Sequence, residues 1–487
     1  MQSSVVAAVP TANSSARHNK QATCLPLQRV KVGMISLGCA KNLADAEIML
    51  GSVLQRGMEI TSRSDDADVL VVNTCAFIDS AKEESIEAIL EAHQQRGLNK
   101  RPDQRLIVSG CMSQRFAREL RKDLPEVDAF VGLDQVSELG DIVEEMVTPP
   151  SRLRDATDAS ETHALLFADT RPTYIPDYDT PRFRLTPTHF AYVKIAEGCN
   201  HPCSFCVIPQ MRGKHRSRKP DSVLAEIRAL VREGVREINV ISQDTTYYGM
   251  DLWQTKAGPR QPVDSTRGPT LAALLREIQK IEGEFWVRLL YTHPAHWSDE
   301  LIETIAECDK VARYIDIPLQ HIDGSMLSRM RRETSREHIE HLIDRLRAGI
   351  PGVTLRTTFI VGFPGETDAE FDALLDLIRR TRFERLGIFK YSREQGSRAA
   401  KMPGQITAKI KNARYRQAMS VQQSIAHDIA RERIGSELKL LVDQPHIARS
   451  EGDAPDIDAR VVLTKPAPVG EFIWRTVTGS RGYDLLT

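Results

Sequence analysis

The sequence lacks any apolar run close to the roughly 18 residues needed to cross a bilayer, and no signal-peptide core follows the first methionine. Its formal net charge is only -1, which gives no global attraction to nucleic acid or membrane. Eight cysteines in 487 residues are too sparse for a disulfide scaffold and suit metal binding in a reducing compartment. We therefore expect a cytoplasmic protein without a membrane partner.

The composition is ordinary for a globular protein, with 41% hydrophobic and 27% charged residues. At roughly 150 residues per domain, the length predicts about three domains, each able to bury its own core. Residues 1–29 are rich in Ala, Ser, Val and Gln and contain no acidic residue. We expect this leader to be disordered.

From residue 30 to 147, short apolar runs alternate with longer helix-like stretches, which predicts an α/β domain with a parallel sheet. The three clearest runs each lead into a cysteine, namely Cys39, Cys75 and Cys111, with equal intervals of 36 residues (75 − 39 and 111 − 75). Any one of them alone would be interpreted as a buried core cysteine. One βα repeat takes about 30 residues or more, so the cysteines should leave the same edge of neighbouring strands and converge on one metal cluster.

Residues 148–188 carry many prolines without a sustained period, which predicts a linker. From 189 to 430 the alternation returns, and six strand-like runs predict a partial (β/α)6 barrel with its active site at the carboxyl ends of the strands. These runs are 192–195, 238–242, 286–291, 314–319, 353–362 and 386–391. Residues 431–487 contain short strand candidates separated by turns, which predicts a small β-barrel.

Cys199, Cys203 and Cys206 form a C-x3-C-x2-C pattern after the first strand of this barrel. Three thiolates on a short loop can hold a 4Fe-4S cluster and leave its fourth iron open to an exogenous ligand. A zinc site is the alternative, but structural zinc needs four ligands, usually in C-x2-C pairs. His201 could supply a fourth ligand, although its position midway between two cysteines gives poor geometry.

This cysteine pattern, following the first of six βα units, resembles the radical S-adenosylmethionine superfamily. The resemblance implies that the open iron binds S-adenosylmethionine, whose reductive cleavage gives a 5′-deoxyadenosyl radical. Residues 358–367, Thr-Phe-Ile-Val-Gly-Phe-Pro-Gly-Glu-Thr, resemble the adenine-proximal motif of that superfamily; alone they would predict only a strand and a Pro-Gly turn. The implied cofactor contacts are Phe205, Gln243, Arg356, Gly362 and Phe363.

From about residue 30 onward the chain resembles the methylthiotransferase family, which joins an amino-terminal cluster domain, a radical barrel and a β-barrel of the TRAM type. The resemblance implies two 4Fe-4S clusters, an auxiliary one on Cys39, Cys75 and Cys111 and a radical one on the compact triplet of Cys199, Cys203 and Cys206. It also implies two uses of S-adenosylmethionine, as methyl donor to sulfur on the auxiliary cluster and as radical source. An external reductant is implied as well, and the sulfur source is unknown.

The substrate in this family is a tRNA adenosine or a protein side chain. Residues 431–487 contain eight Lys or Arg and nine Asp or Glu, a net charge of -1, whereas a module that holds RNA should be basic. We expect the acidic segment 451–458 to help dock a basic ribosomal protein; without the resemblance, a solvated acidic loop would explain it equally well. The basic run 211–219 is the main counterargument, and we interpret it as a cofactor-side or solvated loop.

Segments 36–47 and 449–458 resemble the RimO branch of the family, although Ala40 stands where that branch typically has proline. The resemblance implies methylthiolation of the β-carbon of an aspartate in the small-subunit ribosomal protein twelve. The expected partner is that protein or a ribosomal particle, with tRNA less favoured. Two alternatives stay open, a tRNA adenosine methylthiotransferase and a non-catalytic iron-sulfur carrier.

Overall fold

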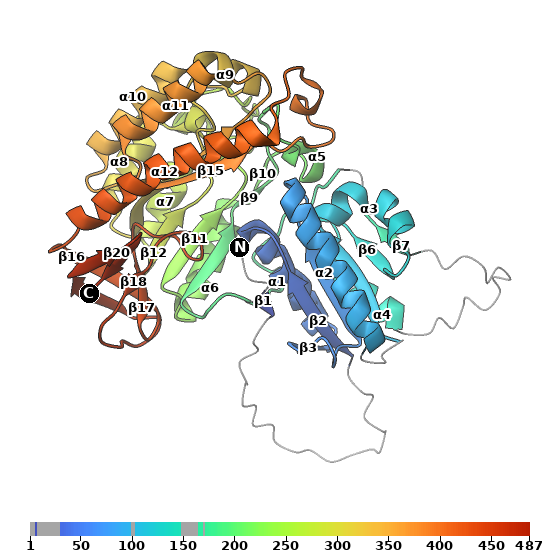
Figure 1. Cartoon of the computed structure of the whole chain (residues 1–487). Helices are drawn as coiled ribbons and strands as arrows, with labels where there is room; N and C mark the ends of the chain where they lie inside the picture. The colour runs from blue at the N-terminus through green and yellow to red at the C-terminus, as the bar shows by residue number, and fades with distance from the viewer. Residues whose placement is uncertain (1–4, 7–29, 99–102, 148–163, 169–170) are drawn as a thin grey trace. The chain divides into compact units, whose positions relative to one another are not determined.

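The structure is a computed structural model that describes residues 5–6, 30–98, 103–147, 164–168 and 171–487 (Figure 1). It divides into two compact units: the first is the chain up to Tyr174 with Asp179–Leu185 and Gln210–Arg212, and the second is Ile175–Tyr178, Thr186–Pro209 and Gly213–Thr487. The predicted disordered leader lies outside the described residues, except for Val5–Val6. No helix within these described ranges is long and apolar enough to cross a membrane.

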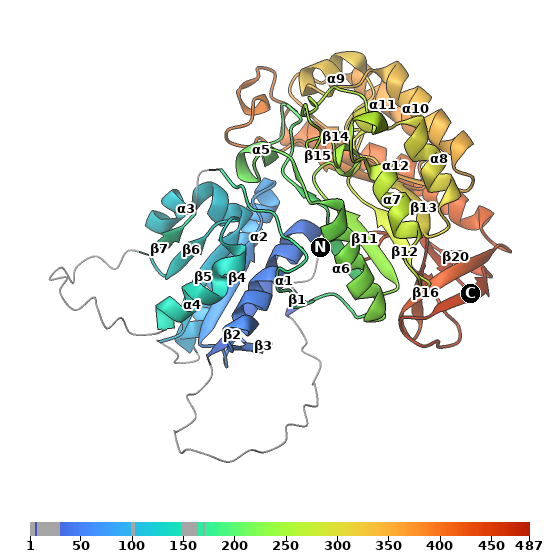
Figure 2. The ribbon, with the colours of Figure 1, turned by 180° about the vertical axis from the view of Figure 1, so that it is seen from behind.

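The first unit contains a sheet with strand order β1-β2-β4-β5-β6-β7, and β3 also pairs with β2. All these pairs are parallel except that of β1 with β2, which confirms the predicted parallel α/β domain. The strands are β1 (Val5–Val6), β2 (Lys31–Ser36), β3 (Glu59–Thr61), β4 (Val69–Thr74), β5 (Arg105–Gly110), β6 (Ala129–Val131) and β7 (Leu165–Phe167). Helices α1 (Ala40–Gln55) and α4 (Leu139–Val147) pack together on one face, and α2 (Asp79–Leu98) and α3 (Cys111–Asp123) cover the other (Figures 1 and 2).

Strand β4 shows why this sheet is parallel and covered on both faces. Its sequence, Val-Leu-Val-Val-Asn-Thr, is buried along its whole length, as is typical of strands in such sheets. The registers pair Ser36 with Asn73 and Thr74 with Gly110, so β2, β4 and β5 end at nearly the same level. Residues that follow these three ends therefore emerge side by side.

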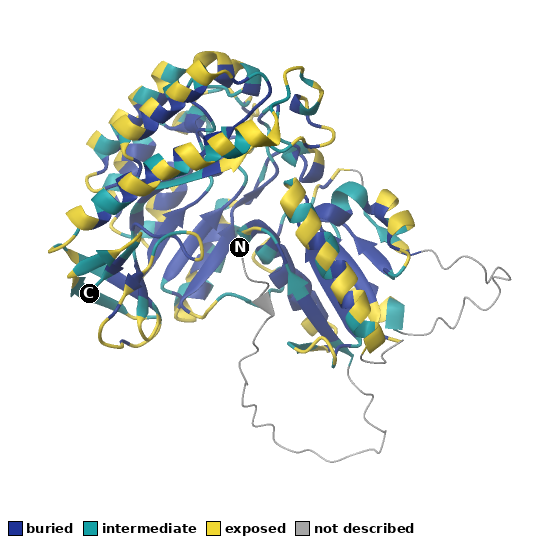
Figure 3. Ribbon diagram, viewed as in Figure 1, coloured by how far each residue is buried: buried dark blue, intermediate teal, exposed yellow. Residues whose placement is uncertain are grey.

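The second unit contains six parallel strands in the order β8-β11-β12-β13-β14-β15, which confirms the predicted partial barrel. The strands are β8 (Phe190–Lys194), β11 (Glu237–Ile241), β12 (Trp286–Leu289), β13 (Val311–Asp316), β14 (Thr354–Val361) and β15 (Arg385–Lys390). The helices are α6 (Pro220–Arg232), α7 (Leu271–Gln279), α8 (Asp299–Glu307), α9 (Gly324–Met330), α10 (Arg336–Gly349), α11 (Asp368–Thr381) and α12 (Ala408–Glu432). Figure 3 shows most of these strands buried and the outer faces of the helices exposed; in β15 only Ile388 is buried.

The carboxy-terminal part of this unit is a mixed sheet with the order β19-β16-β17-β18-β21-β20. Its strands are β16 (Glu437–Gln444), β17 (Ile447–Ser450), β18 (Val461–Val462), β19 (Phe472–Thr476), β20 (Gly479–Arg481) and β21 (Asp484–Leu486). The sequence predicts β16, β18 and β19, whereas the other three are short strands that it does not reveal. The predicted small β domain is confirmed.

The segment 148–188 does more than link domains. Residues 148–163 and 169–170 lie outside the described part, but β7 adds a parallel strand beside β6. Further along, Nε of Arg182 donates to the Glu47 carboxylate of α1 at 2.7 Å. Asp179–Leu185 of the predicted linker therefore belongs to the first unit, whereas Ile175–Tyr178 and the residues from Thr186 onward belong to the second.

Buried ion pairs fix the carboxy-terminal sheet to the barrel strands. Glu237, the first residue of β11, has its carboxylate 2.7 Å from Nε of Arg288 on β12 and 2.6 Å from Nη1 of Arg449 on β17. All three side chains are buried. Arg449 also binds the Asp443 carboxylate at 2.7 and 3.0 Å, so the two elements share one charge network.

The acidic segment 451–458 belongs to the same junction. Asp453 accepts a hydrogen bond from Nε of Arg385 on β15 at 3.2 Å. Asp458 lies 3.5 Å from Nε of Arg356 on β14 and accepts a hydrogen bond from a barrel tyrosine at 2.6 Å. The expectation that this segment docks a basic ribosomal protein is wrong for these two carboxylates, because they neutralise arginines of the chain's own barrel.

Candidate functional site

The spread cysteine triplet, which consists of Cys39, Cys75 and Cys111, lies at the carboxyl edge of the first unit's sheet. Cys39 precedes α1, Cys75 directly follows β4, and Cys111 is the first residue of α3. Cys39 and Cys111 lie close enough to Cys75 for their charges to raise its pKa, and the position of a Cβ on Gly38, next to Cys39, is 3.2 Å from Sγ of Cys75. None of the three forms a disulfide within the described part of the chain.

Glycines that precede two of these cysteines allow the close approach. Gly38 and Gly110 have φ values of +92° and +91°, in the left-handed region that other residues rarely adopt. A Cβ on Gly38 would lie 2.9 Å from Cβ of Cys75, and a Cβ on Gly110 would lie 2.5 Å from the carbonyl oxygen of Thr74. Glycine therefore lets the chain turn from strand to helix while the cysteines stay at the strand ends.

Burial raises the pKa of Cys75 to about 12 and also raises the pKa of Cys111. Cys39 differs: desolvation acts against its thiolate, but the charges of Lys41 and Arg212 and the backbone N–H groups at the start of α1 lower its pKa. Three adjacent thiols that repel one another when ionised are stabilised if metal ions replace their protons. This donor set fits an iron-sulfur cluster, whose usual ligands are thiolates.

The compact triplet lies on the loop between β9 (Ala196–Glu197) and the short helix α5 (Ile208–Met211). The backbone N–H of Cys206 donates to the carbonyl of Cys203 at 3.2 Å, which curls the loop. Gly198 has φ +79°, and a Cβ there would lie 2.2 Å from a backbone carbonyl oxygen of the returning chain. Only glycine fits before the first cysteine of this triplet.

Burial also dominates the electrostatics of the compact triplet. It raises the pKa of Cys206 to about 12 and that of Cys199 well above its usual value, and neighbouring thiols add to both shifts. Arg332 donates to Sγ of Cys203 at 3.5 Å. Three clustered thiols beside a cation fit a second site for an iron-sulfur cluster.

A buried hydrogen-bond network holds His201, which lies inside the compact triplet. Its Nδ1 is 2.5 Å from the Glu333 carboxylate, and its Nε2 is 2.8 Å from that of Asp244. Burial lowers the pKa of His201, but the two carboxylates outweigh it and raise the pKa to about 9. Asp244 also binds Nδ1 of His296 at 2.9 Å. The network clamps the cysteine loop onto the barrel.

Four buried side chains bring possible metal-ligand atoms within 4.8 Å of one another, namely His201, Asp244, His293 and His296. The rings of His201 and His293 stack, with centroids 3.6 Å apart and an interplanar angle of 12°. Since an imidazole lone pair lies in the ring plane, two such rings cannot aim at one ion. The geometry fits a hydrogen-bond network. The sequence pattern indicated only His201 as a possible ligand, because His293 and His296 follow β12 and belong to no recognised motif.

Two predicted cofactor residues meet in one apolar cluster. Phe205, within the compact triplet, packs against a buried group that contains Phe363. Gly362 has φ +73°, and a Cβ there would lie 2.3 Å from a lysine side chain. Its N–H donates to the buried Glu366 carboxylate at 2.6 Å, which fixes the turn after β14.

Gln243 follows β11, and its Nε2 donates to Glu197 at 2.6 Å. Its Oε1 has no hydrogen-bond partner among the described residues, which favours a bound polar molecule at this end of the barrel, and neither has the buried side-chain amide of Asn239 in the middle of β11. Arg356 differs, because its guanidinium binds Asp316 at 2.7 Å and faces a carboxylate of the carboxy-terminal segment. The structure does not support the predicted cofactor contact of Arg356, since two carboxylates engage it.

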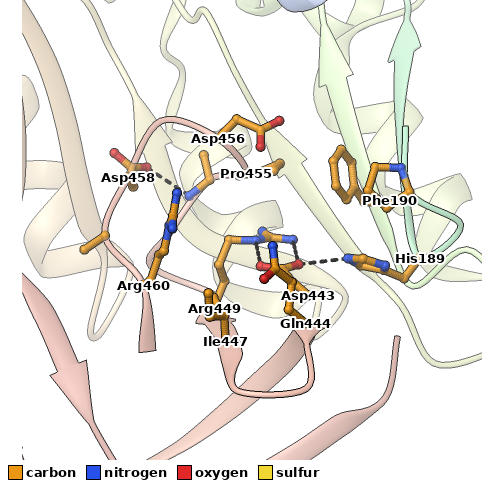
Figure 4. Close-up of a pocket in the computed structure, with 13 residues that line it drawn as sticks. His189, Phe190, Asp443, Gln444, Ile447, Arg449, Pro455, Asp456, Asp458 and Arg460 are labelled. Carbon is orange, nitrogen blue, oxygen red and sulfur yellow. Dashed lines mark hydrogen bonds and ion pairs between the residues drawn. The ribbon is translucent and has the colours of Figure 1, made fainter. Parts of the chain in front are cut away.

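A surface pocket lies at the start of β8 (Figure 4). It is lined by His189, Phe190, Asp443 and Arg449, together with the segment that follows β17. His189 is 2.8 Å from Asp443, which also binds Arg449. Phe190 is the first residue of β8, so the pocket opens at the amino ends of the barrel strands, whereas the compact triplet follows their carboxyl ends. The pocket therefore contributes nothing to the candidate site.

Three family descriptions match the chain in succession. The uncharacterized protein family UPF0004 matches residues 31–132, the radical SAM superfamily matches residues 193–378, and the TRAM domain matches residues 434–487. Each match covers one of the regions that the sequence analysis separates. A radical SAM domain implies S-adenosylmethionine and a 4Fe-4S cluster as cofactors.

Several curated relatives are named ribosomal protein uS12 methylthiotransferase RimO. The protein from Opitutus terrae is 62% identical over 94% of this chain and 96% of its own length, and that from Akkermansia muciniphila is 51% identical over 93% and 98%. Among solved structures, the radical S-adenosylmethionine methyltransferase TsrM from Kitasatospora setae, with tryptophan substrate and a SAM analog bound, is similar at a TM-score of 0.51 and 16% identity. That match covers 74% of this chain and 73% of TsrM, and it concerns the fold alone.

Proposed function

We propose, since the chain belongs to the RimO family of radical S-adenosylmethionine methylthiotransferases, that it attaches a methylthio group to the β-carbon of an aspartate in ribosomal protein uS12. The observation that carries this proposal is the presence of two separate cysteine triplets, each gathered by its own fold element. One triplet suffices to generate a radical. The second gives the chain a place to hold sulfur.

Cys199, Cys203 and Cys206 would hold the radical 4Fe-4S cluster. With S-adenosylmethionine and an electron from an external reductant, this site would supply the radical chemistry that removes a hydrogen atom from an unactivated carbon of the substrate. Phe205 and Phe363 offer an apolar wall for the adenosine part. Such a wall also excludes water and competing groups from a reactive radical.

Polar groups at the end of β9 and within and after β11 would hold the remainder of the cofactor. Gln243 donates to Glu197 and keeps its Oε1 available, while the buried amide of Asn239 needs a partner. We also propose Gly362 as a cofactor contact, because the hydrogen bond from its N–H to Glu366 fixes the turn that ends β14 beside Phe363. The hydrogen bonds of His201 to Glu333 and Asp244 hold the cysteine loop in a fixed position relative to these groups.

Cys39, Cys75 and Cys111 would hold an auxiliary 4Fe-4S cluster, and the sulfur to be transferred would be carried at that site. Two molecules of S-adenosylmethionine are then consumed, one as methyl donor and one as radical source. The reaction also needs an external reductant and a source of sulfur, which other molecules must supply.

The choice of ribosomal protein over tRNA rests on the relatives, because the acidic segment 451–458 is largely engaged within the chain. The net charge of -1 in residues 431–487 supports the same choice, since RNA-binding modules are usually basic. A ribosomal substrate, either the free protein or an assembled particle, gives the enzyme a cytoplasmic location. A tRNA adenosine is the alternative substrate.

Mass spectrometry of ribosomal proteins and tRNA from a deletion strain tests the substrate. Complementation with the wild-type chain should restore a mass gain of one methylthio group on uS12, and a Cys39→Ala, Cys75→Ala, Cys111→Ala variant should not. A modification restored on tRNA adenosine and absent from uS12 would overturn the proposed substrate.

A second measurement separates the enzyme from a non-catalytic iron-sulfur carrier. The reconstituted, reduced protein should form 5′-deoxyadenosine from S-adenosylmethionine, and the same protein with Cys199→Ala, Cys203→Ala and Cys206→Ala should form none. Clusters without any 5′-deoxyadenosine from the wild-type chain would favour the carrier.

A further inference from the structure

A buried arginine reaches the spread cysteine triplet from a distant part of the sequence. Nη2 of Arg212 is 3.2 Å from Sγ of Cys111 and 3.0 Å from Oδ2 of Asp45 on α1. Only 2% of the arginine side chain is exposed, and 4% of that of Asp45. Asp45 therefore anchors a guanidinium that donates to one of the three candidate ligands.

Arg212 belongs to the run 211–219, which the sequence analysis interprets as a cofactor-side or solvated loop. That interpretation is wrong for Arg212 as regards solvation, because the residue is buried and belongs to the first compact unit with Gln210 and Met211. It follows Cys206 by six positions (212 − 206). The segment that carries the compact triplet thus also supplies a side chain to the spread one.

The charge of Arg212 acts on all three cysteines of the spread triplet. It lowers the pKa of each of them, in opposition to the burial that raises the pKa of Cys75 and Cys111. Lys41 adds a second positive charge beside Cys39. The carboxylate of Asp45 acts in the opposite direction and raises the pKa of Cys111.

A cluster on three thiolates needs such a cation. The thiolates outweigh the positive charge of an oxidised 4Fe-4S core, and an anionic fourth ligand adds to the excess. Uncompensated charge in a buried site is costly unless it is paired and hydrogen-bonded. A guanidinium cannot lose its proton at any accessible pH, so its compensation is permanent.

We propose that Arg212 is a positioning residue of the auxiliary site: it donates to the Cys111 thiolate and supplies the charge that lets the site bind an anionic sulfur ligand, a hydrosulfide or an alkanethiolate. The inference rests on the proposed function, since it assigns the spread triplet to an auxiliary cluster. Asp45 fixes the direction of the guanidinium, so that one N–H group points at the cysteine sulfur. Arg212 then determines which ligand charge the fourth iron accepts.

The test uses the full-length chain with Cys199→Ala, Cys203→Ala and Cys206→Ala, so that only the spread triplet can hold a cluster. Arg212→Gln removes the positive charge, and Arg212→Lys keeps the charge but lacks the planar guanidinium group with its several N–H donors. The matched control is Arg105→Gln, which breaks a half-exposed pair with Asp128 at the amino end of β5. Each reconstituted protein is assayed for iron and sulfide, for midpoint potential by electron paramagnetic resonance, and for spectral titration with sodium hydrosulfide and sodium methanethiolate.

The Arg105→Gln variant should bind each of the two anions with the same affinity as the parent protein. Arg212→Gln should bind them about tenfold or more weakly, because a hydrogen bond to a charged group is lost, and its midpoint potential should be lower. Arg212→Lys should recover a large part of both properties. Weakening with only one of the two anions would identify the sulfur form that the site takes, and it supports the proposal.

Unchanged affinity and potential in Arg212→Gln would overturn the proposal. If Arg212→Gln fails to retain iron, Arg212→Lys decides the matter: retained iron and anion binding support the charge argument, and their loss overturns it. A parent that holds no cluster, or that binds neither anion, contradicts the proposed auxiliary site itself, so the two failures are distinguishable.

Discussion

Replacing Glu237 by glutamine tests whether buried charge holds the carboxy-terminal sheet to the barrel. The Glu237 carboxylate accepts from Nε of Arg288 at 2.7 Å and lies 2.6 Å from Nη1 of Arg449. A glutamine of the same shape has one oxygen and one NH₂ group. It can accept from one arginine, and its NH₂ group then faces the N–H groups of the other.

The expected cost follows from this geometry. Two unit charges about 4 Å apart interact by about 4 kcal/mol at an effective dielectric constant of about 20. Removing one partner of a buried pair costs about 3–5 kcal/mol, because the other charge is left uncompensated. Arg449 retains Asp443, whereas the other hydrogen bond found for Arg288 goes to a backbone carbonyl. We therefore expect Glu237→Gln to lower the free energy of unfolding of the second unit by about 3–5 kcal/mol.

Urea unfolding followed by tryptophan fluorescence measures this loss. Trp286 on β12 lies in edge contact with Phe472 on β19, with ring centroids 4.7 Å apart, so its emission reports on the junction. With a slope of about 3 kcal/mol per molar, the midpoint should fall by about 1–1.7 M. The control is Glu300→Gln, which breaks a partly exposed pair with Arg276 and should cost about 0–1 kcal/mol.

A double variant separates charge from packing. Adding Arg288→Met to Glu237→Gln removes the uncompensated guanidinium and should recover most of the lost stability, since apolar replacements of buried ion pairs are often neutral. The reasoning is refuted if Glu237→Gln costs no more than Glu300→Gln. It is also refuted if the added Arg288→Met makes the loss larger.

Three further outcomes follow from the site. Gly198→Ala should roughly halve the iron bound per chain, because a Cβ there would lie 2.2 Å from a backbone carbonyl oxygen and deform the compact triplet's loop. In metal-free protein at pH about 8, iodoacetamide should alkylate Cys39 before Cys75, because the pKa of Cys39 is lowered while that of Cys75 is about 12. Glu333→Gln should speed the release of iron to a chelator, since it weakens one of the two carboxylate contacts that hold His201.

Each of these outcomes has a control. Gly258→Ala should leave the iron content unchanged, because no atom lies within 4 Å of the added Cβ. Alkylation of Cys75 should accelerate about tenfold per pH unit below about 12, since the thiolate is the reactive form. Glu340→Gln, on the outer surface of α10, should release iron at the wild-type rate. Equal alkylation rates at pH about 8, or equal release rates, would contradict the electrostatics described for each site.

The sequence predicts the strands and the cysteine positions well, because both depend on local pattern. Strands β8, β11, β12, β13 and β14 are buried along most of their length, which makes their sequences largely apolar, whereas β15 is only partly buried. The interval between Cys39 and Cys75 is long enough for one βα unit, which takes about 30 residues or more, and the two cysteines do follow the paired strands β2 and β4. Glycines at the turns agree with these assignments.

Contacts between distant segments could not be predicted in this way. The acids of 451–458 look solvated in sequence, yet Asp453 and Asp458 face arginines that precede them by 68 and about 100 positions. Arg212 likewise lies in a basic run and meets a cysteine that is 101 positions away. Charge patterning shows which residues need partners, and only the fold determines which partners they find.

The two triplets differ in how much of the fold must exist before they can take up iron. Cys199, Cys203 and Cys206 lie on a single loop, so a chain whose barrel is incomplete can already offer them to an iron donor. Cys39, Cys75 and Cys111 become neighbours only when β2, β4 and β5 have paired. The proposed auxiliary site can therefore take up its cluster only after this sheet has formed, whereas the proposed radical site does not depend on the pairing of distant strands.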